Sequence, residues 1–236
     1  MTIQYFQGPN NTRTAYIPFQ CRNKETKCFS NLYTTCVELV IPDTRKYEFV
    51  PKSMRGVVFE TCSSEHMWQM LGLMLSHPND RDKIQGLFSV DGVLSDWRVL
   101  KNWKGDIMDK TMKHYGELGI IAKMFTKLGE IECRRKFGVS NKKRNMGSPE
   151  DMWKIWRLIL RAKFTRPDLR KKLMETGDYM LVETMRFTGS DEEGDKKAFW
   201  GAYVSRKEGR KGCLIGRNIM GKFLMRVREG IRLGKY

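Results

Sequence analysis

A short polar cluster precedes an apolar alternation near the start of the chain. In the stretch CFSNLYTTCVELV, the residues Phe29, Ser30 and Asn31 come shortly before the alternating segment that begins at Val37. Serine and asparagine side chains bond readily to nearby backbone, so one interpretation is that they only shape a turn. The other is that the cluster lines a pocket and offers hydrogen bonds to a ligand. The local sequence is compatible with both.

A second polar group lies where the last helix is expected to begin. The stretch GRNIMGKFLMRVRE places Gly216, Arg217 and Asn218 at the mouth of that helix. Backbone amides at a helix start attract anions, and a guanidinium adds bidentate donors. The pattern therefore predicts a position at which phosphate can bind.

A single carboxylate stands at the start of another predicted helix. Ser63 or Ser64 is expected to cap the run EHMWQMLGLML, which puts Glu65 in the first turn. A carboxylate there is stabilised by the helix dipole, so a purely structural role is its simplest interpretation.

Strands are expected beside these residues. Alternating apolar residues predict strands over Val37–Pro42 and Gly56–Thr61, joined by a long hairpin connection. Two later strands are predicted over Tyr179–Thr184 and Phe199–Val204, the second as a strand or the edge of a pocket. The charged run TGSDEEGDKK between them is expected to be a loop.

The last third of the chain has clear helix signals. Ser148 as N-cap and Pro149 at the first position predict a long helix with an apolar stripe. A second helix is expected from Pro167 to about Gly177, and a third after Asn218. Such stripes are typical of core packing.

The segment at about 77–147 is the hardest to interpret. Helices are expected over Ile107–Tyr115 and Leu118–Leu128. The stretch Arg134–Gly147 is expected to be a basic loop, which is either a solvated surface or, with Phe137 among the cations, a grip for a phosphate backbone.

Length and composition indicate one globular domain over 1–236. The six cysteines form no C-x-x-C pair and the three histidines have no ligand spacing, so a structural zinc site is not expected. The unpaired cysteine spacing and the lack of a secretion signal favour reduced thiols, and no cofactor is expected. The chain has no apolar run of membrane-spanning length and no start typical of a signal peptide. We therefore expect a cytoplasmic protein, or one of the host cytoplasm if its source is viral, without a membrane partner.

The formal net charge of +17 is the strongest feature of the composition. Such an excess concentrates polyanions near the protein and accelerates their association. A nucleic acid or a phosphate-rich ligand is the expected partner, although a merely basic surface would carry the same charge. The oligomeric state does not follow from these features.

Five segments in order carry a family resemblance: FSNLY, SSEHMWQ, RAKFTRPDLRKKLMETGDYMLVE, FWG and GRNIMGKFLMRVRE. Their order and wording resemble the NADAR superfamily of YbiA-like N-glycosidases, from about Phe19 onward, with a poorly matched helical and basic segment at about 77–147. The resemblance implies an α+β fold: a single compact, helix-rich domain with a few short strands.

The resemblance also implies hydrolysis at an anomeric carbon. Cleavage of an N-glycosidic bond builds positive charge on the sugar, which a nearby carboxylate stabilises, and Glu65 is the first candidate for that role. Relatives often carry a lysine seven positions later, where this chain has Gly72, so Lys123 is a substitute amine candidate unless it is only a surface lysine. Relatives also often have an aspartate where this chain has Lys197, which leaves Asp195 as the candidate in a longer loop.

The remaining positions are expected to bind substrate. Phe29, Ser30 and Asn31 would stand at the pocket wall, Trp200 would stack on a base, and Gly201 would allow close approach. The resemblance adds Gly216, Arg217 and Asn218 as substrate-binding positions.

The resemblance implies an N-glycosidase, with substrates among its members that include riboflavin-pathway intermediates and ADP-ribose attached to guanine. Of these we expect removal of ADP-ribose from guanine in nucleic acid, because the charge favours a polyanionic substrate. One alternative is an N-glycosidase of riboflavin-biosynthesis intermediates. Another is an inactive module that binds ADP-ribose or nucleotides, which Gly72 and Lys197 would suit. A purely nucleic-acid-binding protein would leave the pocket motifs unexplained.

Overall fold

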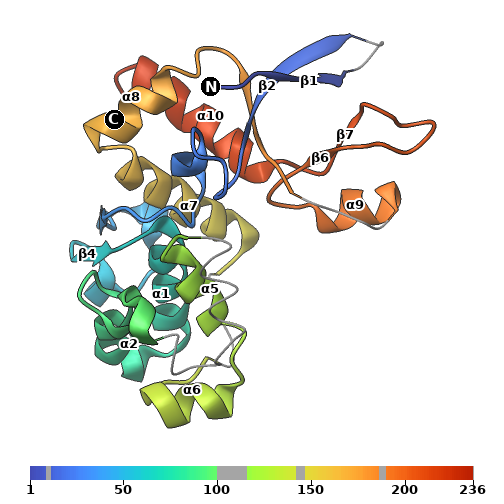
Figure 1. The fold of residues 1–236 in the computed structure, drawn as a ribbon. Coiled ribbons are helices and arrows are strands. Elements are labelled where there is room, and N and C mark those ends of the chain that lie inside the picture. Colours follow the sequence, from blue (N-terminus) through green and yellow to red (C-terminus); the bar gives the residue numbers. More distant parts are fainter. Residues whose placement is uncertain (9–11, 100–115, 142–146, 186–189, 236) are drawn as a thin grey trace. The chain divides into compact units, whose positions relative to one another are not determined.

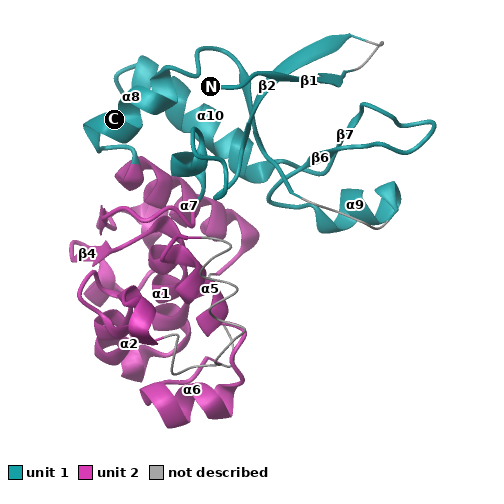
Figure 2. Cartoon of the chain, viewed as in Figure 1, with its two compact units in different colours: residues 1–30, 164–236 teal, residues 31–163 magenta. Residues whose placement is uncertain are grey.

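The computed structural model describes residues 1–8, 12–99, 116–141, 147–185 and 190–235. The chain divides into two units (Figure 2): unit 1 comprises residues 1–30 and 164–236, and unit 2 comprises residues 31–163. The two ends of the chain thus form unit 1, and a continuous central segment forms unit 2. That the whole chain is one domain stays a prediction.

Unit 1 contains a small mixed sheet. Strand β1 (Gln4–Gln7) pairs antiparallel with β2 (Arg13–Phe19), and β2 pairs parallel with β5 (Met180–Glu183). The register places Ile17 opposite Leu181, and both are buried. The strand predicted at 179–184 is confirmed, whereas β1 and β2 were not predicted.

Two helices accompany this sheet in unit 1 (Figure 1). They are α8 (Pro167–Met174) and α10 (Ile219–Arg232), and both begin where the sequence predicts. Helix α10 packs on β5 through a face that includes Phe223 and Val227. Its apolar residues recur every four positions because one side of the helix faces the unit's core.

The charged run after β5 is a helix, so the prediction of a loop is wrong. Helix α9 (Asp191–Lys197) starts with a capping box in which Ser190 and Glu193 satisfy each other's backbone amides. A short hairpin of β6 (Tyr203–Val204) and β7 (Leu214–Ile215) follows. The predicted strand at 199–204 is therefore confined to its last two residues.

Unit 2 begins with the predicted hairpin. Strands β3 (Val37–Val40) and β4 (Val58–Thr61) pair antiparallel with Leu39 opposite Phe59. Helix α1 (Ser64–Ser76) follows β4 and is buried almost all round. It contacts α2 (Arg81–Phe88), α5 (Gly119–Phe125) and α7 (Pro149–Lys163), which surround it (Figure 1).

The middle of unit 2 is partly as predicted. Helix α5 confirms the helix expected near 118–128. Helix α6 (Glu130–Phe137) ends at Gly138 in the left-handed region, so residues 134–137 are helical and not part of a basic loop. The helix predicted over 107–115 lies outside the described residues.

The fold class is α+β, as predicted, with short strands and a majority of helices. Short 3-10 turns occur at Lys27–Phe29, Arg45–Tyr47, Lys52–Met54, Pro78–Asp80 and Val93–Ser95. Within the described ranges, no helix is long and apolar enough to cross a membrane. Nor do three or more metal-ligating side chains meet anywhere in this part of the chain.

Candidate active site

Glu65 lies in the first turn of α1, in unit 2, and is 5% exposed. Ser63 caps the helix, because its Oγ accepts a hydrogen bond of 3.1 Å from the backbone amide of His66. The backbone amide of Glu65 donates to the carbonyl oxygen of Asn31 at 3.0 Å. The start of α1 is thereby joined to the turn that precedes β3.

Two side-chain amides hold the carboxylate of Glu65. Nδ2 of Asn31 donates to Oε2, and Nε2 of Gln69 donates to Oε1 at 2.6 Å. Gln69 follows Glu65 by one helical turn, so α1 itself supplies one of the donors. With both oxygens engaged, the carboxylate has a fixed orientation, and the helix dipole stabilises negative charge there.

A further hydroxyl lies beside this carboxylate in the sequence. Ser64 is fully buried at the first position of α1, and its Oγ makes no hydrogen bond within the described part of the chain. Buried hydroxyls are normally bonded, so Ser64 is a polar group of interest next to Glu65. From the sequence, Ser64 is predicted only as a possible helix cap.

His66, on α1, and Cys62, between β4 and α1, form a buried structural cluster. Nε2 of His66 lies 3.0 Å from the carbonyl oxygen of Leu94, which can only accept, so Nε2 carries the proton. Nδ1 then accepts from Oγ of Ser63 at 2.8 Å. Burial raises the pKa of the Cys62 thiol to about 11, although a hydrogen bond from Ser95 lowers it. Cys62 is therefore not a thiolate nucleophile at neutral pH.

The stability of the folded protein is expected to depend on pH through protonation of the buried His66 imidazole. Burial lowers the pKa of His66 from 6.5 to about 4, against the opposing effect of its hydrogen bond to Leu94. The unfolded chain then binds the extra proton first, so stability falls as the pH drops from about 6.5 to about 4, by about 3 kcal/mol. Denaturant unfolding at a series of pH values measures this loss.

The control for this prediction is His66→Gln, which cannot titrate in that range. Its own stability is expected to change less with acid, so the difference in unfolding free energy between wild type and variant shrinks as the pH falls. A difference that stays constant across the range would contradict the prediction.

The candidate amines differ in their surroundings. Lys123 is exposed on α5, whereas Lys163 at the end of α7 is fully buried, with Nζ at 5.7 Å from the ring centroid of Tyr33. Gly72 is buried in α1. Sequence reasoning missed Lys163, although its K-F dipeptide is part of a quoted motif. A role for Lys123 stays a prediction.

The backbone amides at the start of α10, in unit 1, are already hydrogen-bonded to other backbone groups. The amides of residues 217–220 donate to the carbonyl oxygens of residues 198–201, at distances from 2.8 to 3.3 Å. These amides consequently do not form the phosphate site that the sequence indicated. The helix start instead fastens the FWG segment to α10.

Asn218 joins α10 to β5. It is buried, has a φ of 47°, and its Oδ1 accepts from the backbone amide of Glu183 at 3.1 Å. Its Nδ2 donates to the carbonyl oxygen of Leu181 at 2.8 Å. An asparagine suits this place because it tolerates the left-handed region and bonds backbone on both sides.

Two glycines of the candidate set lie where two backbone segments of unit 1 pass close to each other. A Cβ on Gly201 would collide with the carbonyl oxygen of Glu183, and one on Gly216, whose φ is 108°, would lie 2.8 Å from the carbonyl oxygen of Gly201. Both positions therefore require glycine for packing within unit 1.

Trp200 presents an indole to solvent, with 37% of its surface exposed. Its ring packs edge-on against Phe199 at a centroid distance of 5.2 Å. The guanidinium of Arg217 lies 5.4 Å from the centroid of the Phe199 ring. This group of unit 1 offers a flat apolar face beside a cation.

The other predicted positions have ordinary structural surroundings. Phe29 is fully buried between Phe19 and Phe164, with ring centroids at 6.1 and 6.4 Å, so it belongs to the core and does not line a pocket wall. Ser30 is also buried. Asp195 is exposed on α9 and pairs with Arg210 at 3.1 Å.

The structure thus brings Asn31, Glu65 and Gln69 together in unit 2. Within unit 1 it brings Gly201, Gly216 and Asn218 together. The clearest chemical group is the carboxylate of Glu65, buried at a helix start and oriented by two amides. The chain is thus an α+β protein with this carboxylate at the start of α1, the helix that α2, α5 and α7 surround.

Comparisons with known proteins concern the fold. The chain resembles the NMR structure of the E. coli protein YbiA with 19% sequence identity, over 93% of this chain and 86% of that one, at a TM-score of 0.47. No protein-family model matches the sequence, and no curated protein matches it.

Proposed function

We propose that this protein is an N-glycosidase that hydrolyses an N-glycosidic bond at an anomeric carbon. The observation that carries the proposal is Glu65, whose buried carboxylate accepts a hydrogen bond on each oxygen. Transition-state charge is best stabilised by groups whose orientation is settled before reaction. The order of the five sequence motifs supports the same reaction.

In the proposed reaction the bond from the anomeric carbon to the base nitrogen breaks, and its electron pair stays on the nitrogen. Water forms the new bond to carbon, one of its protons is lost and the base nitrogen gains one. Glu65 stabilises the positive sugar or orients the water. Asn31 and Gln69 act as positioning residues, because they hold the carboxylate.

The proposed substrate is ADP-ribose attached to guanine in nucleic acid. The net charge of +17 supports a polyanionic substrate, since a small metabolite needs only a few cations in its pocket. The alternative of a binding module without turnover is favoured by Gly72, which has no amine where the resembling family has one.

Single-stranded DNA with ADP-ribosyl guanine tests the proposal, with a riboflavin-pathway intermediate in parallel. Mass spectrometry should detect free ADP-ribose and unmodified DNA. If only the riboflavin-pathway intermediate reacts, that small molecule is the substrate instead of ADP-ribosyl guanine. If neither compound reacts, the binding module is favoured.

Replacing the exposed indole is expected to weaken ligand binding. Stacking of one base on an aromatic ring contributes about 1–3 kcal/mol, so Trp200→Ala should raise the Kd for ADP-ribose by roughly 5-fold to 150-fold. Titration calorimetry measures the change.

The control for that variant is Trp200→Phe, which keeps a flat ring and should retain more of the affinity. Since Trp200 is partly exposed, neither change should greatly alter the melting temperature. An unchanged Kd in Trp200→Ala would mean that the indole does not contact the ligand.

A further inference from the structure

Three cations form a stripe along α7. Lys154, Arg157 and Arg161 are spaced by three and four residues, so they lie on one side of the helix. At a rise of 1.5 Å per residue the stripe covers roughly 10 Å. In B-form DNA the phosphates of one strand advance by roughly 3.4 Å each along the helix axis, so the stripe matches about three nucleotides of such a strand.

Lys46 adds a fourth cation from the turn that precedes Phe49. Its ammonium pKa is lowered by burial and then by the charges of Arg161, Arg157 and Lys154. These charges therefore act on one another although 108 residues separate Lys46 from Lys154 in the sequence. Mutual repulsion is relieved when an anion binds, which favours a polyanionic partner.

Aromatic rings support the ammonium groups. Nζ of Lys154 lies 5.6 Å from the ring centroid of Phe49, and Nζ of Lys46 lies 5.6 Å from that of Tyr47. The two rings are 6.4 Å apart. Cation–π contacts of this kind orient the ammonium groups on the surface.

Three contacts within α7 neutralise or orient two of these cations. Lys154 pairs with Asp151 at 3.0 Å and with Glu150 at 3.6 Å, so its charge is partly neutralised within α7. Nε of Arg157 donates to the carbonyl oxygen of Trp153 at 3.2 Å, which orients its guanidinium. Lys154 therefore contributes less net positive charge to the stripe.

We propose that Lys46, Lys154, Arg157 and Arg161, termed the α7 cation cluster, form a docking surface for the phosphate backbone of a nucleic-acid strand. This surface does not depend on hydrolysis at Glu65. A membrane partner is disfavoured, because the large exposed apolar side chains of the described residues include none from 44–50 or from α7. Helices that bind membranes need such a face.

The test is the salt dependence of binding to an unmodified single-stranded oligonucleotide of about 20 nucleotides, followed by fluorescence anisotropy between about 50 and 300 mM NaCl. The variant combines Lys46→Gln, Arg157→Gln and Arg161→Gln. Each lost phosphate contact lowers the slope of log K against log salt by about 0.7, so the slope should fall by roughly 2 and the affinity at least about tenfold.

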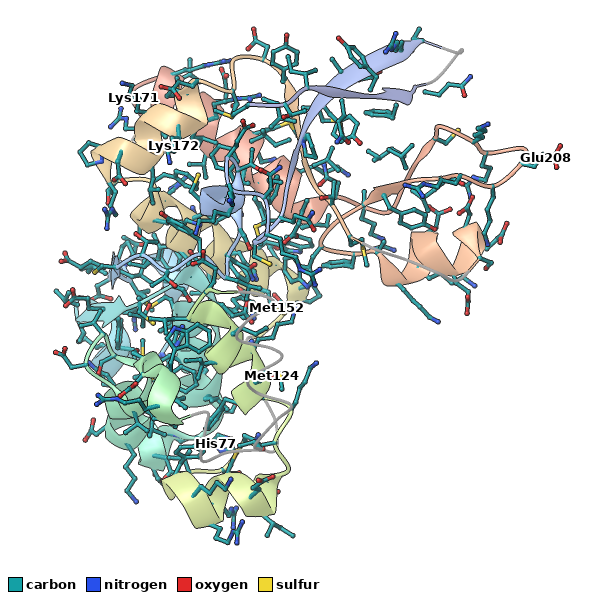
Figure 3. The ribbon with its side chains drawn as sticks, viewed as in Figure 1. His77, Met124, Met152, Lys171, Lys172 and Glu208 are labelled. Atoms are coloured by element: carbon teal, nitrogen blue, oxygen red, sulfur yellow. The ribbon has the colours of Figure 1, made fainter. Side chains whose placement is uncertain are left out.

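The matched control removes the same charge elsewhere. Arg170→Gln, Lys171→Gln and Lys172→Gln change three exposed cations of α8 in unit 1, two of which are labelled in Figure 3. This variant should lose less than about threefold in affinity, through net charge alone. Equal losses in the two triple variants would overturn the proposal.

Two further variants separate charge from folding and from catalysis. Arg157→Lys with Arg161→Lys keeps the charge and should keep the slope, whereas a loss of the slope there would overturn an electrostatic surface. Glu65→Gln should bind the oligonucleotide like wild type. This binding is expected even if the protein is not an N-glycosidase. If vesicles of phosphatidylserine, and not the oligonucleotide, depend on the α7 cation cluster for binding, the nucleic-acid assignment is overturned.

Discussion

Glu65→Gln is expected to reduce turnover by roughly 10²-fold to 10⁴-fold, the range typical of removing a group that acts on the transition state. The substitution preserves the size of the side chain and removes its charge. Positive charge on the sugar then lacks its stabilising partner, so the loss should appear in kcat. Single-turnover release of ADP-ribose, followed by mass spectrometry, measures the effect.

The local hydrogen bonds make this variant interpretable. Glutamine offers one acceptor and one NH2 group where two donors now point, from Asn31 and Gln69. Rotation of either neighbouring amide by half a turn restores a donor–acceptor match, so the fold should persist. Thermal unfolding of the variant checks this directly.

Two comparisons complete the experiment. Glu38→Gln removes an exposed carboxylate from β3 of the same unit and should leave turnover unchanged. Gln69→Ala removes a positioning amide and should cost roughly 10-fold to 100-fold, mostly in kcat. Full activity of Glu65→Gln would exclude this carboxylate from the mechanism.

Gly221→Ala is expected to destabilise the protein by about 3 kcal/mol, as overpacking at a backbone contact does. Gly221 faces β5 from the first turn of α10, and a Cβ there would collide with the carbonyl oxygen of Leu181 and lie 2.6 Å from the side chain of Asn218. Neither partner can retreat, because Asn218 bonds the β5 backbone on both sides. Chemical denaturation measures the loss.

Gly86→Ala is the matched control for this prediction. Gly86 is exposed within α2, and a Cβ there would meet no atom within 4 Å. The same substitution should therefore stabilise the protein by about 0.5–1 kcal/mol, by restricting the unfolded chain and favouring helix. Equal effects at the two glycines would refute the packing explanation.

Local signals predicted much of the fold. Ser63 and Ser148 begin helices because their hydroxyls accept from backbone amides three residues later, a pattern visible within four letters. The hairpin of β3 and β4 follows from apolar alternation. The charged run predicted as a loop is helix α9 because Ser190 and Glu193 form a capping box at its start.

The sequence by itself determined the class of the fold, the starts of α1, α7, α8 and α10, the positive charge and the place of Glu65 at the beginning of α1. Tertiary structure alone decided that Asn31, 34 residues earlier, donates to this carboxylate, and that the α10 amides are occupied by the FWG segment. It also decided that Lys154 of α7 lies 5.6 Å from the ring centroid of Phe49, next to the turn that carries Lys46. The reason is physical: capping and periodicity act within a few residues, whereas these contacts join distant segments that only packing of the folded chain brings together.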